Sequence, residues 1–459
     1  MQSNSLVEAD RRHLIHPVAA YRAHEQRGAT VLTSGKGMYL TDAAGNELLD
    51  AFAGLWCVNI GYGQESVVAA ATEQMRRLPY ATGYFSFASE PTIRLAEKLA
   101  ELSPPGLDRV YFTLGGSDAI DSAIRFITHF YNVTGRPTKK QMIALDKGYH
   151  GSSSTGAGLT GLPVFHRAFD LPRAWQHHIP APYPYRSPVG DDPQAIIDHS
   201  VAQLRAKVEA LGAENVAAFF AEPVQGSAGV IVPPRGWLRA IRETCRELDI
   251  LFVADEVITG FGRTGPMFAC EAEQVSPDLM TIAKGLTAGY APMGAVLMSE
   301  AVYAGIADGA DPTTPIGHGG TYSGHPVSAA VGLEVLSLYL QGGILANGQA
   351  RVPELAAGLD ALRDHPLVGD VRQAGMLGGL ELVSDKLRKT RFAPGLGIAD
   401  RLSQAAYKRK LIFRAFGDGT IGLAPALSCN ADEMSILLDR LRATLDDVLD
   451  QREVRDVLV

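Results

Sequence analysis

The sequence predicts an α/β protein built on a mostly parallel central sheet. Short apolar runs rich in β-branched or aromatic residues alternate with amphipathic helical patterns, and glycine, proline or charge bounds each run. Helices between parallel strands cover both faces of such a sheet, and ligands bind beyond the carboxyl ends of the strands. The expected strands are 110–113, 142–145, 216–220, 250–253 and 295–298, and the expected helices are 118–131, 195–211 and 237–248.

The two ends of the chain predict a smaller α+β domain. Residues 37–40 and 47–52 indicate a short meander. A long helical pattern follows Pro326, residues 368–383 end in a strand-like stretch, and a last helix is expected over 432–449. We therefore expect an N-terminal segment (1–60) that contributes to the small domain, a large domain (61–327) and a C-terminal small domain (328–459).

Composition excludes several classes of protein. The 459 residues allow two or three domains with a large core. A net charge of −8 argues against a nucleic-acid-binding surface. Four scattered cysteines form no CxxC pair, so neither a structural zinc site nor a disulfide framework is expected. The first residues lack the apolar core of a signal peptide, and no apolar run reaches membrane-spanning length, so we expect a cytoplasmic protein without a membrane partner.

Two segments, 156–161 (GAGLTG) and 260–265 (GFGRTG), match the G-x-G-x-x-G pattern of dinucleotide-binding folds. That fingerprint requires a strand before the glycines and a helix after them. No clear strand immediately precedes the first match, and no helical pattern follows the second. A Rossmann site is therefore not favoured.

The segment VYFTLGGSDAID predicts a strand, a tight Gly-Gly-Ser turn and a helix that starts at once. Free N–H groups and the helix dipole make such an N-terminus a natural phosphate site, with Gly116 allowing close approach and Ser117 adding a hydroxyl. The segment also resembles the nucleophile elbow of α/β-hydrolases, with Asp255 and His318 or His325 as triad partners. Ser117 as a simple N-cap is a third interpretation.

Three further features carry chemistry. Asp255 and Glu256 follow an apolar strand, where buried carboxylates need a charged or hydrogen-bonding partner. Lys284 stands in an uncharged stretch and is either an amine of lowered pKa or a solvated loop lysine. Tyr149 lies in a glycine-flanked loop, where its ring could cover a planar ligand.

Together these features describe a pyridoxal phosphate (PLP) site, with phosphate on the Gly116–Ser117 helix start, Asp255 at the pyridinium nitrogen and Lys284 as the Schiff-base lysine. Here the sequence resembles the class III aminotransferases, of the ω-transaminase or amine–pyruvate type, among the fold-type-I PLP enzymes. The resemblance runs from about residue 37 to beyond 420. The segments that carry it are LDAFAGLWCVNIGYG, LGGSDAID, GYHGS, FFAEPVQGSAGVIVPP, ADEVITGFGRTG, IAKGL and HGGTYSGHP.

The resemblance implies a role for each matching residue. Lys284 would be the catalytic lysine, and residues 61–327 would form the PLP-binding domain. The family is typically a homodimer, or a dimer of such dimers, with active sites shared between subunits. The residues expected to bind the cofactor are Gly116, Ser117, Tyr149, Glu222, Asp255, Val257, Lys284 and Thr321, the last from the neighbouring subunit.

GLWCVN and LIFRAFGDG are similar to segments that bind substrate in ω-transaminases. The resemblance implies a substrate pocket lined by Trp56, Tyr84 and Tyr149. Arg414 would bind the carboxylate of an oxo-acid acceptor bidentately and swing away for an uncharged amine, because a buried unpaired guanidinium is costly.

Other functions remain open at the level of sequence. An aminomutase, decarboxylase or epimerase could use the same cofactor and fold, and a hydrolase would use Ser117. A non-catalytic binding protein would not account for Lys284 and Asp255. Departures from the family, which put the amine spectrum in doubt, are Gly320 in place of a large aromatic, Val18 in place of phenylalanine, and Asp146–Lys147 in place of Trp-Asn.

Overall fold

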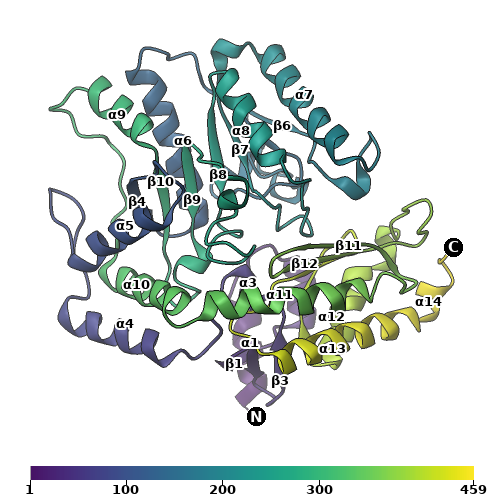
Figure 1. Cartoon of the computed structure of the whole chain (residues 1–459). Helices are drawn as coiled ribbons and strands as arrows, with labels where there is room; N and C mark the ends of the chain where they lie inside the picture. The colour runs from purple at the N-terminus through teal and green to yellow at the C-terminus, as the bar shows by residue number, and fades with distance from the viewer. Residues whose placement is uncertain (1) are drawn as a thin grey trace.

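The computed structural model describes residues 2–459, with side chains from Ser5 onward. Its largest sheet has seven strands (Figure 1) in the order β4-β10-β9-β8-β7-β5-β6. Strand β10 runs antiparallel to both of its neighbours, and the other strands run parallel, so the predicted mostly parallel α/β fold is confirmed. The strands are β4 (Arg109–Thr113), β5 (Gln141–Leu145), β6 (Gln176–Ile179), β7 (Val216–Ala221), β8 (Leu251–Asp255), β9 (Leu279–Ile282) and β10 (Gly294–Met298).

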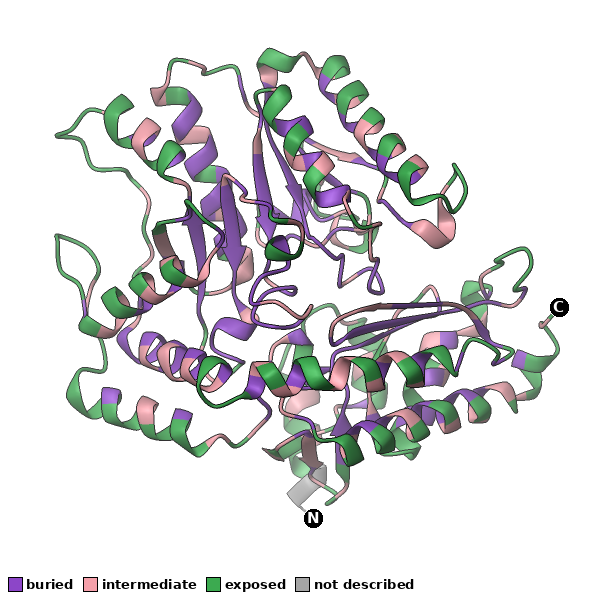
Figure 2. Ribbon diagram, viewed as in Figure 1, coloured by how far each residue is buried: buried purple, intermediate pink, exposed green. Residues whose placement is uncertain are grey.

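Alternate residues of each central strand bury against opposite layers of helices. On β7, Ala218 and Phe220 join the core beneath α6 (Gly116–Val133) and α9 (Glu300–Gly309). Phe219 and Ala221 join the core beneath α7 (Pro193–Leu211) and α8 (Trp237–Glu247). The strands are buried while the helices expose their outer faces (Figure 2). Burial on both faces explains why these strands are continuous apolar runs.

The two ends of the chain meet in a second sheet, β1-β2-β3-β13. Leu49 of β3 pairs in parallel with Leu411 of β13, although 362 positions of sequence separate them (411 − 49). The expected meander is therefore present as β2 and β3, and one further strand, β1, precedes it in the sequence. The strands are β1 (Leu32–Lys36), β2 (Tyr39–Asp42), β3 (Glu47–Asp50) and β13 (Leu411–Ile412).

A third sheet, β11-β12-β15-β14, lies in the C-terminal part beside α11 and α13 (Figure 1). Residues 368–383, predicted to be strand-like only at their end, form an antiparallel hairpin that turns at Gly375. The elements are β11 (Val368–Ala374), β12 (Leu377–Leu382), β14 (Arg414–Ala415), β15 (Thr420–Leu423), α11 (Ile344–Asp360), α12 (Ile398–Lys408), α13 (Ala431–Leu449) and α14 (Arg452–Arg455).

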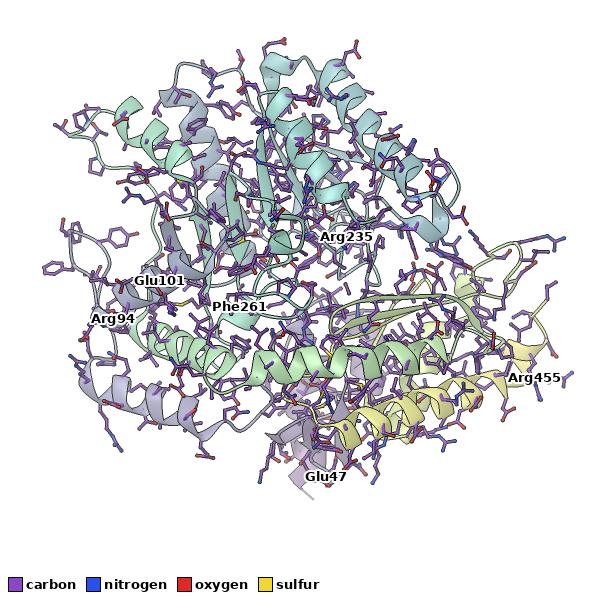
Figure 3. The ribbon with its side chains drawn as sticks, in the orientation of Figure 1. Glu47, Arg94, Glu101, Arg235, Phe261 and Arg455 are labelled. Atoms are coloured by element: carbon purple, nitrogen blue, oxygen red, sulfur yellow. The ribbon has the colours of Figure 1, made fainter. Side chains whose placement is uncertain are left out.

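The remaining helices precede the large sheet or connect the parts. Helix α10 (Pro326–Leu340) packs on α4 and α5. Phe261 stacks on Tyr339 of α10 at a centroid distance of 6.1 Å, where the large sheet approaches this helix (Figure 3). Among the described helices none alone is long and apolar enough to cross a bilayer, and α10 and α11 pass that test only as a pair bent by 56°. The others are α1 (Gln2–His13), α2 (Tyr21–Arg27), α3 (Ala53–Trp56), α4 (Glu65–Arg77) and α5 (Glu90–Leu102).

Neither glycine-rich match forms a dinucleotide-binding turn. Residues Gly156–Gly158 are a 3-10 turn, and 260–265 lie in turns before another 3-10 segment, Ala269–Glu273. No α-helix begins at either place, as the Rossmann fingerprint would require.

Candidate active site

The carboxyl ends of the parallel strands bring the predicted acidic groups together. Asp255, the last residue of β8, is 3% exposed and accepts a hydrogen bond from the Val257 amide at 3.1 Å. Its other oxygen lies 2.8 Å from Nδ1 of His150, which follows β5. A buried carboxylate needs a charged or hydrogen-bonding partner, and His150 is that partner here.

Glu222, just beyond β7, forms the second buried acid of the site. Its two oxygens accept hydrogen bonds from the amides of Tyr149 at 2.8 Å and Gly226 at 3.0 Å. Burial raises the pKa of Glu222 to about 7, although the nearby His150 opposes that shift. Glu222 thereby holds the backbone of the loop that carries Tyr149.

Lys284 follows β9 and lies close to both acids. Burial lowers its pKa, and the charges of Asp255 and Glu222 oppose that effect. Its backbone has φ 39°, a left-handed conformation that a lysine rarely adopts. Within the described residues the amine donates no hydrogen bond, so its nitrogen is available to a ligand. The structure does not favour a fully solvated loop lysine, because the side chain is only partly exposed at the strand end and the surrounding protein lowers its pKa.

The glycine turn after β4 provides the anion site. A Cβ at Gly116 would lie 3.0 Å from Cγ1 of Val257, whereas a Cβ at Gly115 would meet nothing within 4 Å. Gly115 is the N-cap of α6, so Ser117 is the second residue of the helix and not its cap. The Ser117 hydroxyl accepts a hydrogen bond from the Ser152 amide at 3.2 Å. Open space in front of free helix N–H groups suits a phosphate.

Trp56 and Arg414 lie on the same face of the third sheet. Arg414 of β14 is paired with Gly422 of β15, and opposite residues in an antiparallel pair project to the same face. A Cβ at Gly422 would lie 2.7 Å from Cη2 of Trp56. The Arg414 guanidinium lies 5.2 Å from the ring centre of Phe416 and has no hydrogen-bond or ion-pair partner among the described residues. The surrounding protein lowers its pKa although the residue is exposed in the single chain.

Tyr84 and Thr321 lie on two neighbouring exposed loops. The Tyr80 hydroxyl donates to the Thr321 carbonyl at 2.9 Å, and a Cβ at Gly319 would lie 2.5 Å from the Tyr84 hydroxyl. No hydrogen bond, ion pair or ring contact within the described residues joins either side chain to Lys284. One chain therefore does not bring these two residues to the buried acids.

The three departures from the family lie at different places. Val18 lines a cavity of about 1180 Å³ that also reaches Ser152 and Phe165, beside the Tyr149 ring. Gly320 donates to the Ser323 hydroxyl at 3.2 Å within a turn. Lys147 reaches towards Asp418, with 3.9 Å between Nζ and Oδ2.

The hydrolase interpretation of Ser117 is wrong. Nε2 of His318 pairs with the Ser122 hydroxyl at 3.0 Å, and Asp255 pairs with His150. No histidine hydrogen-bonds to Ser117 in the described part of the chain, so the nucleophile lacks its general base.

Sequence reasoning missed His150 as the partner of Asp255. It directly follows Tyr149, and a histidine beside the end of a parallel strand was the available signal. Its Nε2 is buried without a hydrogen-bond partner among the described residues. The pairing depends on the neighbouring positions of β5, β7 and β8 in the sheet, which the sequence pattern does not state.

The geometry fits pyridoxal phosphate. A free amine stands beside two buried acids, an open glycine turn starts a helix, and Val257 and Tyr149 belong to the loops around them. Such an arrangement is typical of enzymes that attach an aldehyde cofactor to a lysine and hold its phosphate at a helix N-terminus.

Comparison with known proteins agrees with this assignment. The family model for class III aminotransferases matches residues 20–445. A putrescine–pyruvate aminotransferase of Pseudomonas aeruginosa is 42% identical, over 95% of this chain and 94% of the relative. A diaminobutyrate–2-oxoglutarate transaminase of Halomonas elongata is 39% identical, over 97% and 96%.

Solved structures of omega-transaminases also resemble this chain closely. A thermostable (S)-enantioselective omega-transaminase from Thermomicrobium roseum superposes with a TM-score of 0.94 at 39% identity, over 98% of this chain and 99% of that one. An omega-transaminase from Pseudomonas jessenii in complex with PMP gives 0.93 at 36% identity, over 97% and 98%. The chain belongs to the class III aminotransferases, which are PLP-dependent enzymes.

Proposed function

We propose that the protein is an ω-transaminase that moves an amino group from a primary amine, diamine or ω-amino acid to pyruvate or a similar oxo acid in a ping-pong reaction. The observation that carries this proposal is the Arg414 guanidinium, which has no partner in the described residues and shares a sheet face with Trp56. An arginine beside an aromatic wall suits a site that alternates between a carboxylate and an uncharged chain. One relative is named for a diamine, putrescine, and another for a diamino acid, diaminobutyrate, and both names support a donor with two amino groups.

Lys284 and the side chains around it have separate roles in such a reaction. PLP, when bound, supplies an electron sink that stabilises negative charge at the carbon next to the transferred nitrogen. Lys284 binds the cofactor, then takes and returns the proton at that carbon through Nζ. Asp255, oriented by His150, holds the ring nitrogen in its protonated state.

The other residues hold the cofactor in position. The helix start at Gly116 and Ser117 binds the phosphate, and Val257 and Tyr149 cover the two ring faces. Glu222 keeps the Tyr149 loop in place through its amide hydrogen bond of 2.8 Å. We assign these cofactor-holding roles from the positions of the side chains around the Lys284 amine.

We also infer a homodimer with shared sites. Several aromatic side chains beside Thr321 are open to solvent in the single chain, and such a patch is typical of an interface. Thr321 would reach the phosphate of the neighbouring subunit's site, and Tyr84 its substrate pocket. The exposed fractions are 42% for Tyr84, 86% for Phe85, 64% for Phe87 and 55% for Tyr322. We place the protein in the cytoplasm, which suits its four free cysteines.

The decisive experiment follows each half-reaction in a single turnover. Amine donors are first screened with pyruvate while alanine formation is measured, and turnover that needs no oxo acid would instead indicate an aminomutase, decarboxylase or epimerase. The Arg414→Ala variant should then lose about 10- to 150-fold in kcat/KM for pyruvate, because a charge-assisted hydrogen bond contributes roughly 1.5–3 kcal/mol. The half-reaction with a carboxylate-free amine should change far less.

The matched control is Arg388→Ala, which removes a surface arginine whose side chain is 75% exposed and should leave both half-reactions unchanged. Equal losses for pyruvate and a carboxylate-free amine in Arg414→Ala would show that Arg414 supports the fold or cofactor instead. An unchanged pyruvate reaction would place the carboxylate elsewhere.

A further inference from the structure

Three side chains with metal-binding donor atoms converge in the N-terminal part of the chain, apart from the buried acids of the active site. Asp10 belongs to α1, His16 follows that helix, and His24 belongs to α2. Nε2 of His16 lies 2.6 Å from Oδ1 of Asp10, and Nε2 of His24 lies 2.8 Å from Oδ2. All three donor atoms lie within 4.8 Å of one another, and the imidazole centroids are 4.2 Å apart.

This donor set suits a divalent transition metal. Imidazole nitrogens and a carboxylate bind Zn²⁺ at about 2.0–2.2 Å, which places donors of a tetrahedral site roughly 3.4 Å apart. The present separations run from 2.6 Å to at most 4.8 Å, so the ligands would move only slightly. We propose that Asp10, His16 and His24 bind a divalent transition metal ion, represented by Zn²⁺, with water completing the coordination. Each neutral imidazole then carries its proton on Nδ1, which frees Nε2 for the metal.

Contacts between the two helices hold the ligands near each other without the metal. The Arg11 guanidinium donates to the Gln26 carbonyl at 3.2 Å, and a Cβ at Gly28 would lie 2.7 Å from Cγ1 of Val7. The ligand side chains are only 9% exposed at Asp10, 14% at His24 and 29% at His16. A site whose ligands are already gathered loses less conformational entropy when the metal binds.

A metal ion bound by Asp10, His16 and His24 would affect the cavity next to these residues. Residues 17–21, between the two histidine ligands, line the cavity of about 1180 Å³ that Ser152–Ser154 line from the other side. The serine segment directly follows the loop of Tyr149 and His150. A metal that joins α1 to α2 would therefore fix one wall of the cavity beside the active site. The binding claim does not rest on the proposed transaminase reaction.

The test measures metal binding by the full chain without an affinity tag and with PLP bound. Equilibrium dialysis against Zn²⁺ should give one ion per chain, and Co²⁺ should give visible d–d absorption. Asp10→Asn, His16→Gln and His24→Gln should each weaken binding at least about tenfold, since even the loss of a supporting partner of a ligand typically costs 10- to 100-fold. Zn²⁺ should raise the melting temperature of the wild type and not of these variants.

His13→Ala is the matched control, because it removes an exposed histidine of the same helix that lies outside the three-residue set. It should bind Zn²⁺ as the wild type does. Retained cofactor absorbance shows that each variant is folded. Unchanged Zn²⁺ binding in the three ligand variants, or no binding by the wild type up to about 100 μM Zn²⁺, would overturn the proposal.

Discussion

Glu381 of β12 is a buried carboxylate that joins the third sheet to Tyr183 and Arg186, and its ionisation should control acid stability. The side chain has no exposed surface. Arg186 donates to it at 2.6 Å, Arg391 at 3.2 Å and Arg372 at 3.3 Å, and the Tyr183 hydroxyl also donates. Burial alone would raise its pKa, but the hydrogen bonds from Tyr183 and Arg186 and the other arginine charges lower it to about 2.

The magnitude follows from that shift. The ordinary pKa is 4.5 and the folded value about 2, so ionisation of Glu381 stabilises the fold by about 3 kcal/mol at neutral pH. Because the folded pKa is lowered, this contribution is complete above pH 4.5 and is lost as the pH falls towards 2. At about pH 3.5 roughly 2 kcal/mol remains. If the whole chain unfolds together, about 3 kcal/mol corresponds to about 3 °C in melting temperature.

The assay is thermal unfolding of the wild type and Glu381→Gln at pH 7 and at about pH 3.5. The variant should melt at least about 3 °C lower than the wild type at pH 7, and this difference in melting temperature should narrow by about 1 °C at the lower pH. Glu73→Gln, which neutralises an exposed carboxylate on α4, should change neither value. The reasoning would be refuted if the two proteins melted at the same temperature at pH 7, or if the difference in melting temperature widened in acid. Either result would mean that the arginines do not stabilise the fold through the Glu381 charge.

Three further outcomes are expected. Lys284→Ala should retain no PLP after borohydride reduction, as measured by intact mass, and should lose turnover. If the mass of this variant increases as much as that of the wild type, PLP is attached to another residue. Burial raises the pKa of Glu222 from 4.5 to about 7, so the apoprotein should lose stability as pH rises through that interval, since only the folded chain keeps the proton. Glu222→Gln should remove this slope in thermal unfolding, and an unchanged slope would assign it to other groups. Phe85→Asp, at a side chain 86% exposed, should convert dimers to monomers in light scattering, whereas an unchanged mass would move the interface.

Local sequence was sufficient to predict which candidate site residues lie at strand ends. The Gly116–Ser117 turn, Asp255 and Lys284 each follow an apolar run directly, and a strand end fixes where the next residues lie. The parallel sheet was predictable for the same reason, since its strands are buried on both faces and are therefore short apolar runs. The antiparallel direction of β10 was not, because apolar composition carries no strand direction.

Pairings between distant segments could not be derived from local patterns. His150 meets Asp255 across 105 positions because β7 separates β5 from β8 in the sheet and all three end at one edge. Trp56 packs over Gly422, the pairing partner of Arg414, because that glycine has no side chain. Asp10, His16 and His24 gather because α1 packs against α2. Periodicity and turn residues specify local conformation, whereas strand order and helix packing arise from burial of the whole chain, and these bring the distant side chains into contact.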